Sequence, residues 1–198
     1  MYYDVAQGTW NQISGWSGTN AVSWKAPKEG AFWLHVEVKL HDGTVKTYTR
    51  GYNVTRYPAD VTAMINVANN YSSPSGYLLL VNRNTRKVGI FTGGQGNWSP
   101  LKYWDCTVGA PGTPTVAGVF SIGSRGGYFY SDDPIICYWY TQFYGGYLFH
   151  SVLYNRYTGG LLDGTLGAAL SHGCVRLQID NAKWIYNNIP AGSTVVVY

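Results

Sequence analysis

The sequence predicts a mainly β protein with two helices, built as a small antiparallel β-module followed by a larger domain. Three observations lead to this prediction. Only 12% of the 198 residues are charged, whereas the residues typical of strands and tight turns, such as Tyr, Trp, Val and Gly, are abundant. Apolar and polar residues alternate over several short stretches, and apolar residues follow helical spacing in only two places. We expect residues 1–57 to form the module and residues 58–198 the larger domain.

The alternation is clearest at residues 32–40, where a strand is predicted. One face of this strand carries Leu34, Val36, Val38 and Leu40. The opposite face carries His35, Glu37, Lys39 and His41. Asp42 and Gly43 then predict a tight turn into a second strand, and residues 15–33 predict a short strand, a Pro/Gly loop and the next strand. The pattern of residues 1–57 resembles the partial immunoglobulin-like modules found in front of bacterial surface enzymes.

Two histidines of this strand could serve as metal ligands. His35 and His41 lie six residues apart on the polar strand face. A solvated polar face is the simpler interpretation.

Helical spacing occurs first after Pro58, where Asp60 falls in the first turn. The apolar residues at this spacing are Val61, Met64, Ile65 and Ala68. The second helix is predicted over residues 179–190, with Asp180 as its cap and Pro190 at its end. Its inward residues are Ala182, Ile185 and Ile189.

Short strands fill the rest of the larger domain. Residues 77–94 predict an apolar strand, a polar turn at Asn82 to Arg86 and a return strand. Further strands are predicted within the following ranges: 102–111, 117–125, 135–144, 147–154 and 193–198.

Bulk properties exclude several classes of protein. The net charge of +4 is small and scattered, so we expect no nucleic-acid partner. No run of 18 or more apolar residues exists, so we expect no membrane-spanning segment in this chain. The first ten residues do not have the pattern of a signal peptide, and the chain is therefore expected to be a mature fragment whose own sequence does not give its location.

Several side chains that could take part in a reaction lie together in the stretch SHGCVRL, residues 171–177. A cysteine attacks carbonyl carbons as a thiolate and needs a base within hydrogen-bond reach. His172 lies two residues before Cys174, and His150 ends an aromatic strand on which it shares a face with Leu148. Gly173 would let the backbone N–H groups of residues 173 and 174 face a substrate oxygen, and Arg176 could hold a carboxylate.

Other interpretations of these cysteines remain open. Cys174 could be a structural thiol, or His172 and Cys174 could begin a zinc site that Cys106, Cys137 and His150 would have to complete. Cys106 and Cys137 could form a disulfide that leaves Cys174 free, or both could be ordinary buried thiols.

The stretch SHGC, preceded by FHS at residues 149–151, resembles the signature of the L,D-transpeptidase catalytic domain of the YkuD type. The resemblance spans about residues 73–198. It includes the hairpin at 77–94, the segment VGAPGTPTVAGVFSI at 108–122 and the closing helix and strand. It implies a β-sandwich or barrel of that family with two helices.

The resemblance also implies roles for individual residues. Cys174 would be the nucleophile and His150 the general base, oriented by Ser151. His172 would support the pocket, and Gly173 with Cys174 would line the oxyanion site. The residues expected to contact substrate are Arg176, Ser171, Tyr140 and Gln142. Neither a metal nor another cofactor is implied.

The implied reaction transfers an acyl group within the bacterial cell wall, which places the protein outside the cell. Cys174 would attack the third residue of a peptidoglycan tetrapeptide stem, release D-Ala and pass the acyl group to a second stem as a 3→3 cross-link. Carbapenems would be inhibitors. Hydrolysis, as in an L,D-carboxypeptidase, and a non-catalytic wall-binding module are the alternatives. A sortase is disfavoured, because its cysteine follows a Thr-Leu-x-Thr pattern.

Two features depart from the family pattern. Residues 151–170 make the spacer between His150 and Ser171 a few residues longer than usual, so a longer loop is expected beside the site. Some members also carry Asn at the position of Arg176.

Overall fold

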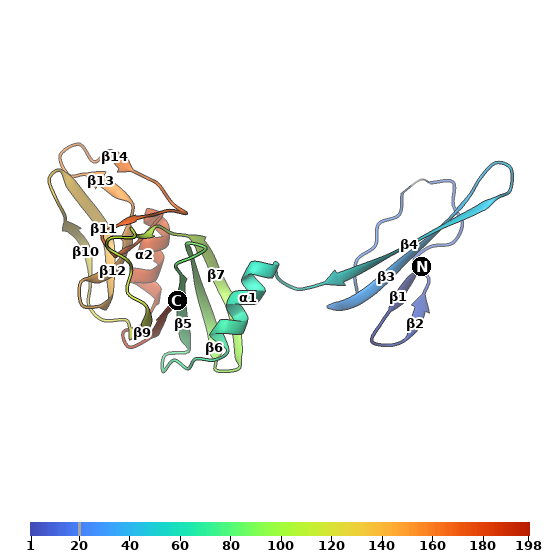
Figure 1. The fold of residues 1–198 in the computed structure, drawn as a ribbon, viewed down its shortest axis with the longest axis horizontal. Helices are drawn as coiled ribbons and strands as arrows, with labels where there is room; N and C mark the ends of the chain where they lie inside the picture. Colours follow the sequence, from blue (N-terminus) through green and yellow to red (C-terminus); the bar gives the residue numbers. More distant parts are fainter. Residues whose placement is uncertain (20) are drawn as a thin grey trace. The chain divides into compact units, whose positions relative to one another are not determined.

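The computed structural model describes residues 1–19 and 21–198. The chain divides into two compact units, residues 1–59 and residues 60–198. Figure 1 shows the strands and helices of each unit. The mainly β architecture with two helices is confirmed.

The first unit is a four-stranded sheet in the order β2-β1-β3-β4. Its strands are β1 (Tyr2–Asp4), β2 (Thr9–Asn11), β3 (Gly30–Lys39) and β4 (Val45–Val54). The long hairpin β3–β4 is the one that the Asp42–Gly43 turn predicted. In this turn the Asp42 carboxylate accepts the Thr44 N–H at 2.9 Å, and Gly43 takes a positive φ of 86° that favours glycine.

The segment between β2 and β3 does not contain the predicted short strand. Its described residues, 12–19 and 21–29, form loops, and Asn20 lies outside the described residues. Trp24 explains the difference, because its ring lies 5.4 Å from Tyr2 and 5.5 Å from Phe32 and so covers the sheet instead of extending it. The described residues of this unit form one sheet, and its immunoglobulin-like character stays a prediction.

The second unit contains a five-stranded sheet in the order β7-β6-β5-β17-β9. Its strands are β5 (Tyr77–Asn82), β6 (Lys87–Gly94), β7 (Asn97–Asp105), β9 (Gly118–Ser121) and β17 (Thr194–Val197). The C-terminal β17 runs parallel to β5, with Val195 opposite Leu79. This pairing places the end of the chain in the middle of the sheet.

A second sheet of this unit follows the order β14-β13-β11-β12-β16, with β10 also paired to β11. Its strands are β10 (Arg125–Tyr130), β11 (Ile135–Tyr144), β12 (Tyr147–Ser151), β13 (Leu153–Asn155), β14 (Leu161–Asp163) and β16 (Val175–Leu177). The short strands β8 (Val108–Gly109) and β15 (Ala169–Ser171) pair with each other. The segment expected to be a longer loop therefore contains β14 and β15, and β10 was not predicted.

The helices α1 (Ala59–Ala68) and α2 (Ile179–Asn188) form at the predicted places. Met64 of α1 joins a buried cluster with Leu78, Leu80 and Phe91 on one face of the five-stranded sheet. The predicted inward residues of α2 are all buried between the two sheets. Gln178, not Asp180, is the N-cap residue of α2, because the helix already begins at Ile179 and Asp180 falls in its first turn.

No helix formed by the described residues is long and apolar enough to cross a membrane.

Candidate active site

His150 and Cys174 are brought together by two neighbouring parallel strands. In the pairing of β12 with β16, Phe149 lies opposite Val175 and His150 lies opposite Arg176. Phe149 and Val175 point into the core, so His150 and Arg176 lie on the opposite face of the sheet. Cys174 immediately precedes β16. Its Sγ lies 3.5 Å from the carbonyl oxygen of Gly146, just before the start of β12.

The backbone fixes the orientation of the His150 imidazole. Its Nδ1 lies 2.7 Å from the carbonyl oxygen of Ser151, to which an N–H at this position donates, and Nε2 is then left as an acceptor. The side chain is 3% exposed. Burial lowers the pKa of His150 to about 4, despite the Ser151 hydrogen bond, and the positive charge of Arg176 adds to the lowering. The imidazole is therefore neutral at pH 7 and able to accept a proton.

The predicted role of Ser151 is divided between its backbone and its side chain. Its carbonyl oxygen orients His150, whereas its hydroxyl accepts the Tyr138 N–H at 2.9 Å and donates to the Val152 carbonyl at 2.6 Å. The hydroxyl thus stabilises the β11–β12 region. Orientation of the histidine comes from the main chain.

The three thiols differ in exposure. Cys106 and Cys137 are almost fully buried, and burial raises the pKa of each to about 12. Cys174 is partly exposed. Burial raises its pKa as well, while a hydrogen bond from the Leu148 backbone and the charge of Arg176 act in the opposite direction. Cys174 is the thiol that reagents can reach.

The disulfide considered for Cys106 and Cys137 is absent, since both are free thiols. Their surroundings explain this. Cys106 lies in the main core cluster beside the charges of Asp105 and Lys87, whereas Cys137 on β11 lies near the charges of Arg176 and Cys174. The two thiols belong to different parts of the unit.

The loop before Cys174 is tied together by Ser171. The Ser171 hydroxyl donates to the Cys174 carbonyl at 2.6 Å and accepts the Gly173 N–H at 3.1 Å. Ser171 is 1% exposed and holds the loop, and its contact with substrate stays a prediction. The Gly173 N–H is engaged by the Ser171 hydroxyl, contrary to the expectation that it would be free for an oxyanion. The Cys174 N–H stays a predicted oxyanion donor.

Gly173 is nevertheless required at its position. Its φ is +120°, a backbone conformation that residues with a side chain rarely adopt. A Cβ atom at this position would also lie 2.7 Å from the Tyr147 ring. His172, its neighbour, is exposed, and its predicted supporting role stays a prediction.

Arg176 is 9% exposed and forms an ion pair with Asp163, with Nη1 3.2 Å from Oδ2. Asp163 ends β14, inside the segment between His150 and Ser171. Nε of Arg176 has no hydrogen-bond partner among the described residues. Asp163 was not predicted as a site residue, although it is the only acidic residue between His150 and Cys174 and could have been found on that ground.

The two remaining predicted contacts differ from each other. The Gln142 amide is engaged within its own neighbourhood, accepting from the Ser124 hydroxyl at 2.9 Å and donating to the Gly145 carbonyl at 2.6 Å. It is therefore not free for substrate. The Tyr140 ring lies 5.9 Å from Phe129, whose edge in turn meets His150 at 5.1 Å. Tyr140 thus reaches the site through a second ring, and its substrate contact stays a prediction.

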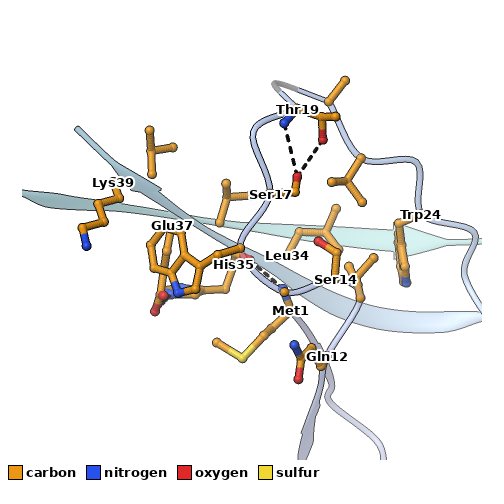
Figure 2. Close-up of a pocket in the computed structure, with 17 residues that line it drawn as sticks. Met1, Gln12, Ser14, Ser17, Thr19, Trp24, Leu34, His35, Glu37 and Lys39 are labelled. Carbon is orange, nitrogen blue, oxygen red and sulfur yellow. Dashed lines mark hydrogen bonds and ion pairs between the residues drawn. The ribbon is translucent and has the colours of Figure 1, made fainter. Parts of the chain in front are cut away.

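A cavity of about 880 Å³ lies elsewhere, within the first unit (Figure 2). Figure 2 shows it between β3 and the segment that follows β2, where Ser17 and Thr19 join their hydroxyls at 2.7 Å. Leu34, Val36 and Val38 line it together with Trp16 and Trp24. His35 lines it, but none of the predicted catalytic or substrate-binding residues lies there.

A family of known proteins matches the second unit of this chain. The L,D-transpeptidase catalytic domain family, YkuD, matches residues 76–197. A Bacillus subtilis protein named as an L,D-transpeptidase, YciB, is 37% identical over 89 residues, which cover 42% of this chain and 46% of that protein.

Several solved structures share the fold of this chain. A Clostridium acetobutylicum protein, described as a fused Zn-dependent amidase, peptidase and peptidoglycan-binding domain-containing protein, is 37% identical, with a TM-score of 0.59 over 73% of this chain and 65% of that one. The fold is also similar to an L,D-transpeptidase from Mycobacterium smegmatis, at 22% identity and a TM-score of 0.50 over 62% of this chain and 58% of that one. The L,D-transpeptidase LdtMt1, solved in complex with imipenem, is 16% identical, with a TM-score of 0.51 over 87% of this chain and 69% of that one.

The chain spans less than two thirds of the length of the Bacillus and Clostridium proteins. The family match, in contrast, extends over more than half of this chain and includes His150 on β12 and Cys174 just before β16. The chain belongs to the L,D-transpeptidase catalytic domain family, YkuD.

Proposed function

We propose that the chain is a cysteine-dependent L,D-transpeptidase that acts on peptidoglycan stem peptides in the bacterial cell wall. The observation that carries the proposal is the β12–β16 pairing, which places a neutral, backbone-oriented imidazole on the sheet face beside a partly exposed thiol. A base and a nucleophile in this relation are the parts that acyl transfer through cysteine requires.

The thiol and the imidazole are both uncharged before substrate binds. Burial raises the pKa of Cys174 and lowers that of His150, and both shifts disfavour a thiolate–imidazolium pair. Among the described residues, the Cys174 thiol bonds to the Gly146 carbonyl and not to His150. The proton therefore moves to His150 as the thiol attacks, and a catalytic hydrogen bond of this kind commonly tightens only with substrate.

Acylation begins when Sγ of Cys174 attacks the carbonyl carbon of the third stem residue and His150 takes the thiol proton. The bond to D-Ala breaks, and the leaving amine takes that proton from His150. The product is a thioester on Cys174 and free D-Ala. Arg176 supplies a positive charge that would hold a substrate carboxylate.

The second half-reaction decides between transpeptidation and hydrolysis. An amine from a neighbouring stem attacks the thioester, gives its proton to His150 and leaves a 3→3 cross-link, while the thiol is restored. Water in place of the amine would release a tripeptide, as in an L,D-carboxypeptidase. The amine is the expected acceptor because of the family to which the chain belongs.

A covalent adduct tests the nucleophile. Imipenem is a suitable probe, because a structure of similar fold was solved in complex with it. We expect intact-mass spectrometry to show one imipenem added to the wild-type chain and none to Cys174→Ala. Cys106→Ala, which removes a buried thiol with a pKa of about 12, serves as the control and should keep the adduct. An unmodified wild-type mass would contradict the proposal.

The role of His150 as general base is tested by the rate at which the imipenem adduct forms. We expect His150→Asn to slow formation of the imipenem adduct by about 10²–10⁴-fold, the usual contribution of general base catalysis. A rate within a few-fold of wild type would exclude His150 as the base.

A defined tetrapeptide separates the remaining alternatives. Cross-linked dimer is the expected product, and tripeptide alone would indicate a carboxypeptidase. If the chain binds insoluble peptidoglycan but forms neither product, the wall-binding alternative holds instead.

A further inference from the structure

The longer spacer between His150 and Ser171 delivers one acidic side chain to the site. In this segment β14 pairs with β13, and Asp163 lies opposite Leu153 at the end of β14. Its carboxylate lies 3.2 Å from Nη1 of Arg176. We propose that Asp163 is a positioning residue that holds the Arg176 guanidinium toward substrate and offsets its charge beside Cys174. This inference rests on the proposed function of the site.

The Asp163 carboxylate is held by a closed set of contacts. Its Oδ1 accepts the Thr165 N–H at 2.9 Å, and the Thr165 carbonyl accepts the Thr107 hydroxyl at 2.6 Å. Thr107 and Arg176 then exchange two backbone hydrogen bonds, at 2.9 and 2.8 Å. These hydrogen bonds connect Asp163 through Thr165 and Thr107 back to Arg176. The carboxylate and its arginine partner are therefore held by the same group of backbone segments. This arrangement preorganises the ion pair before substrate arrives.

Arg176 needs this partner because it is buried. An arginine that is 9% exposed requires a counter-charge, and among the described ion pairs Asp163 supplies it. The ion pair engages Nη1, while Nε has no hydrogen-bond partner among the described residues. Asp163 therefore fixes the guanidinium through Nη1 and leaves its buried Nε without a partner.

The same ion pair sets the charge near the nucleophile. The ionisable groups whose charges act at this end of the sheet are Arg176 beside Cys174 on β16, His150 on β12, Cys137 on β11 and Asp163 on β14. The positive charge of Arg176 lowers the pKa of Cys174 and that of His150. Because Asp163 pairs directly with Arg176, we expect its negative charge to act against that influence.

Removing the Asp163 carboxylate is expected to make Cys174 more reactive and, at the same time, to slow the processing of stem peptides. In Asp163→Asn the charge of Arg176 is no longer offset, so the pKa of Cys174 falls and more thiolate is present at a given pH. The guanidinium also loses its anchor, so stem peptides are processed more slowly. A small neutral alkylating agent reports the first effect, because it does not use Arg176 for binding.

The test compares Asp163→Asn with the wild type and with Asp133→Asn. Asp133 pairs with Arg156 at 2.8 Å and makes no contact with Arg176, so this control removes the acidic partner of another arginine in the same unit. Alkylation of Cys174 by iodoacetamide is followed across pH by intact mass, and tetrapeptide processing is followed by its products.

For Asp163→Asn we expect the midpoint of the alkylation profile to move down by about 0.5–1 pH unit and peptide processing to fall about 10-fold. Asp133→Asn should match the wild type within about twofold in both assays. Asp163→Glu keeps the charge and is expected to restore the alkylation profile, at reduced peptide processing.

Wild-type behaviour of Asp163→Asn in both assays would overturn the inference. A parallel fall of alkylation and processing, with a lower melting temperature, would also overturn it, because a merely structural role moves both downward. If the wild type processes no peptide, the proposed function fails, while the alkylation profile of Asp163→Asn still decides whether Asp163 controls the charge at Cys174.

Discussion

Two hairpins of this protein were predicted from similar turn patterns in the sequence, but their strands are buried to very different extents. β3–β4 in the first unit and β5–β6 in the second are both antiparallel pairs joined by a short polar turn. Most residues of β4 are exposed, and Val36 in β3 is 54% exposed. The central residues of β5 and β6 are buried on both faces, by α1 and its cluster on one side and by the main core on the other.

The difference follows from the kind of apolar pattern. Residues 77–81 are a continuous apolar run, typical of a strand buried on both faces, whereas residues 34–40 alternate, typical of a strand with one polar face. The turn signal therefore specifies the hairpin, and the apolar pattern indicates how many of its faces will be covered.

The largest effect expected from this comparison is a loss of core packing in β5. Leu80→Ala removes a fully buried side chain and should lower the free energy of unfolding of the second unit by about 2–5 kcal/mol. Val36→Ala in β3 should change stability by less than about 0.5 kcal/mol, since its side chain is half exposed. Urea unfolding with hydrogen exchange followed on each hairpin measures both. Equal losses of unfolding free energy in the two variants would contradict the difference in burial between the hairpins.

The buried histidine of the second unit should make its stability depend on pH. The pKa of His150 lies near 4 in the folded state and near its usual 6.5 when unfolded, so the unfolded state binds more protons between these values. Its contribution to stability is complete above about pH 6.5 and is lost as the pH falls toward 4, by roughly 3 kcal/mol in all. Urea unfolding at pH 7, 5.5 and 4 should show this loss in the wild type and not in His150→Asn. The same loss in both proteins would assign it to other groups.

A smaller effect is expected at a glycine of the covered hairpin. Gly89 lies opposite Leu80, and a Cβ atom at this position would collide with the sulfur of Met64 and lie 2.8 Å from the Phe91 ring. We expect Gly89→Ala to destabilise the second unit by about 1–3 kcal/mol, the usual cost of overpacking. A neutral result in thermal unfolding would mean that α1 can move away from the sheet.

The smallest effect concerns the corresponding glycine of the exposed hairpin. Gly51 in β4 lies opposite Trp33, whose ring would be 3.7 Å from an added Cβ atom, an ordinary contact distance. Gly51→Ala should therefore leave stability unchanged or raise it by up to about 0.5 kcal/mol, because alanine has fewer unfolded conformations to lose. A destabilisation as large as that of Gly89→Ala would show that this face is more crowded than the exposure of its neighbours indicates.

The site shows where prediction from local sequence succeeds. His150 and Leu148 were expected to share a strand face, and strand alternation is enough to predict this. Ser151 was also expected to orient His150, and its carbonyl oxygen makes that contact. In both cases the partners are neighbours in the chain.

Contacts between distant segments were predicted less well. The Asp163–Arg176 pair was missed, the Cys106–Cys137 disulfide does not form, and the amide of Gln142 is engaged by its own hairpin. The engagement of the Gly173 N–H by Ser171 is local, but it depends on a turn geometry that residue types alone do not specify.

The sequence by itself determined the two helices and the longer strands of the second unit except β10, most of its inward residues and the SHGC motif at Cys174, because each depends on residues a few positions apart. Only the tertiary structure decided that β12 pairs with β16, that Asp163 meets Arg176 and that one hairpin is covered on both faces while the other is exposed. These outcomes depend on pairings across tens of residues, and many such pairings are compatible with the same local pattern until the whole core is packed.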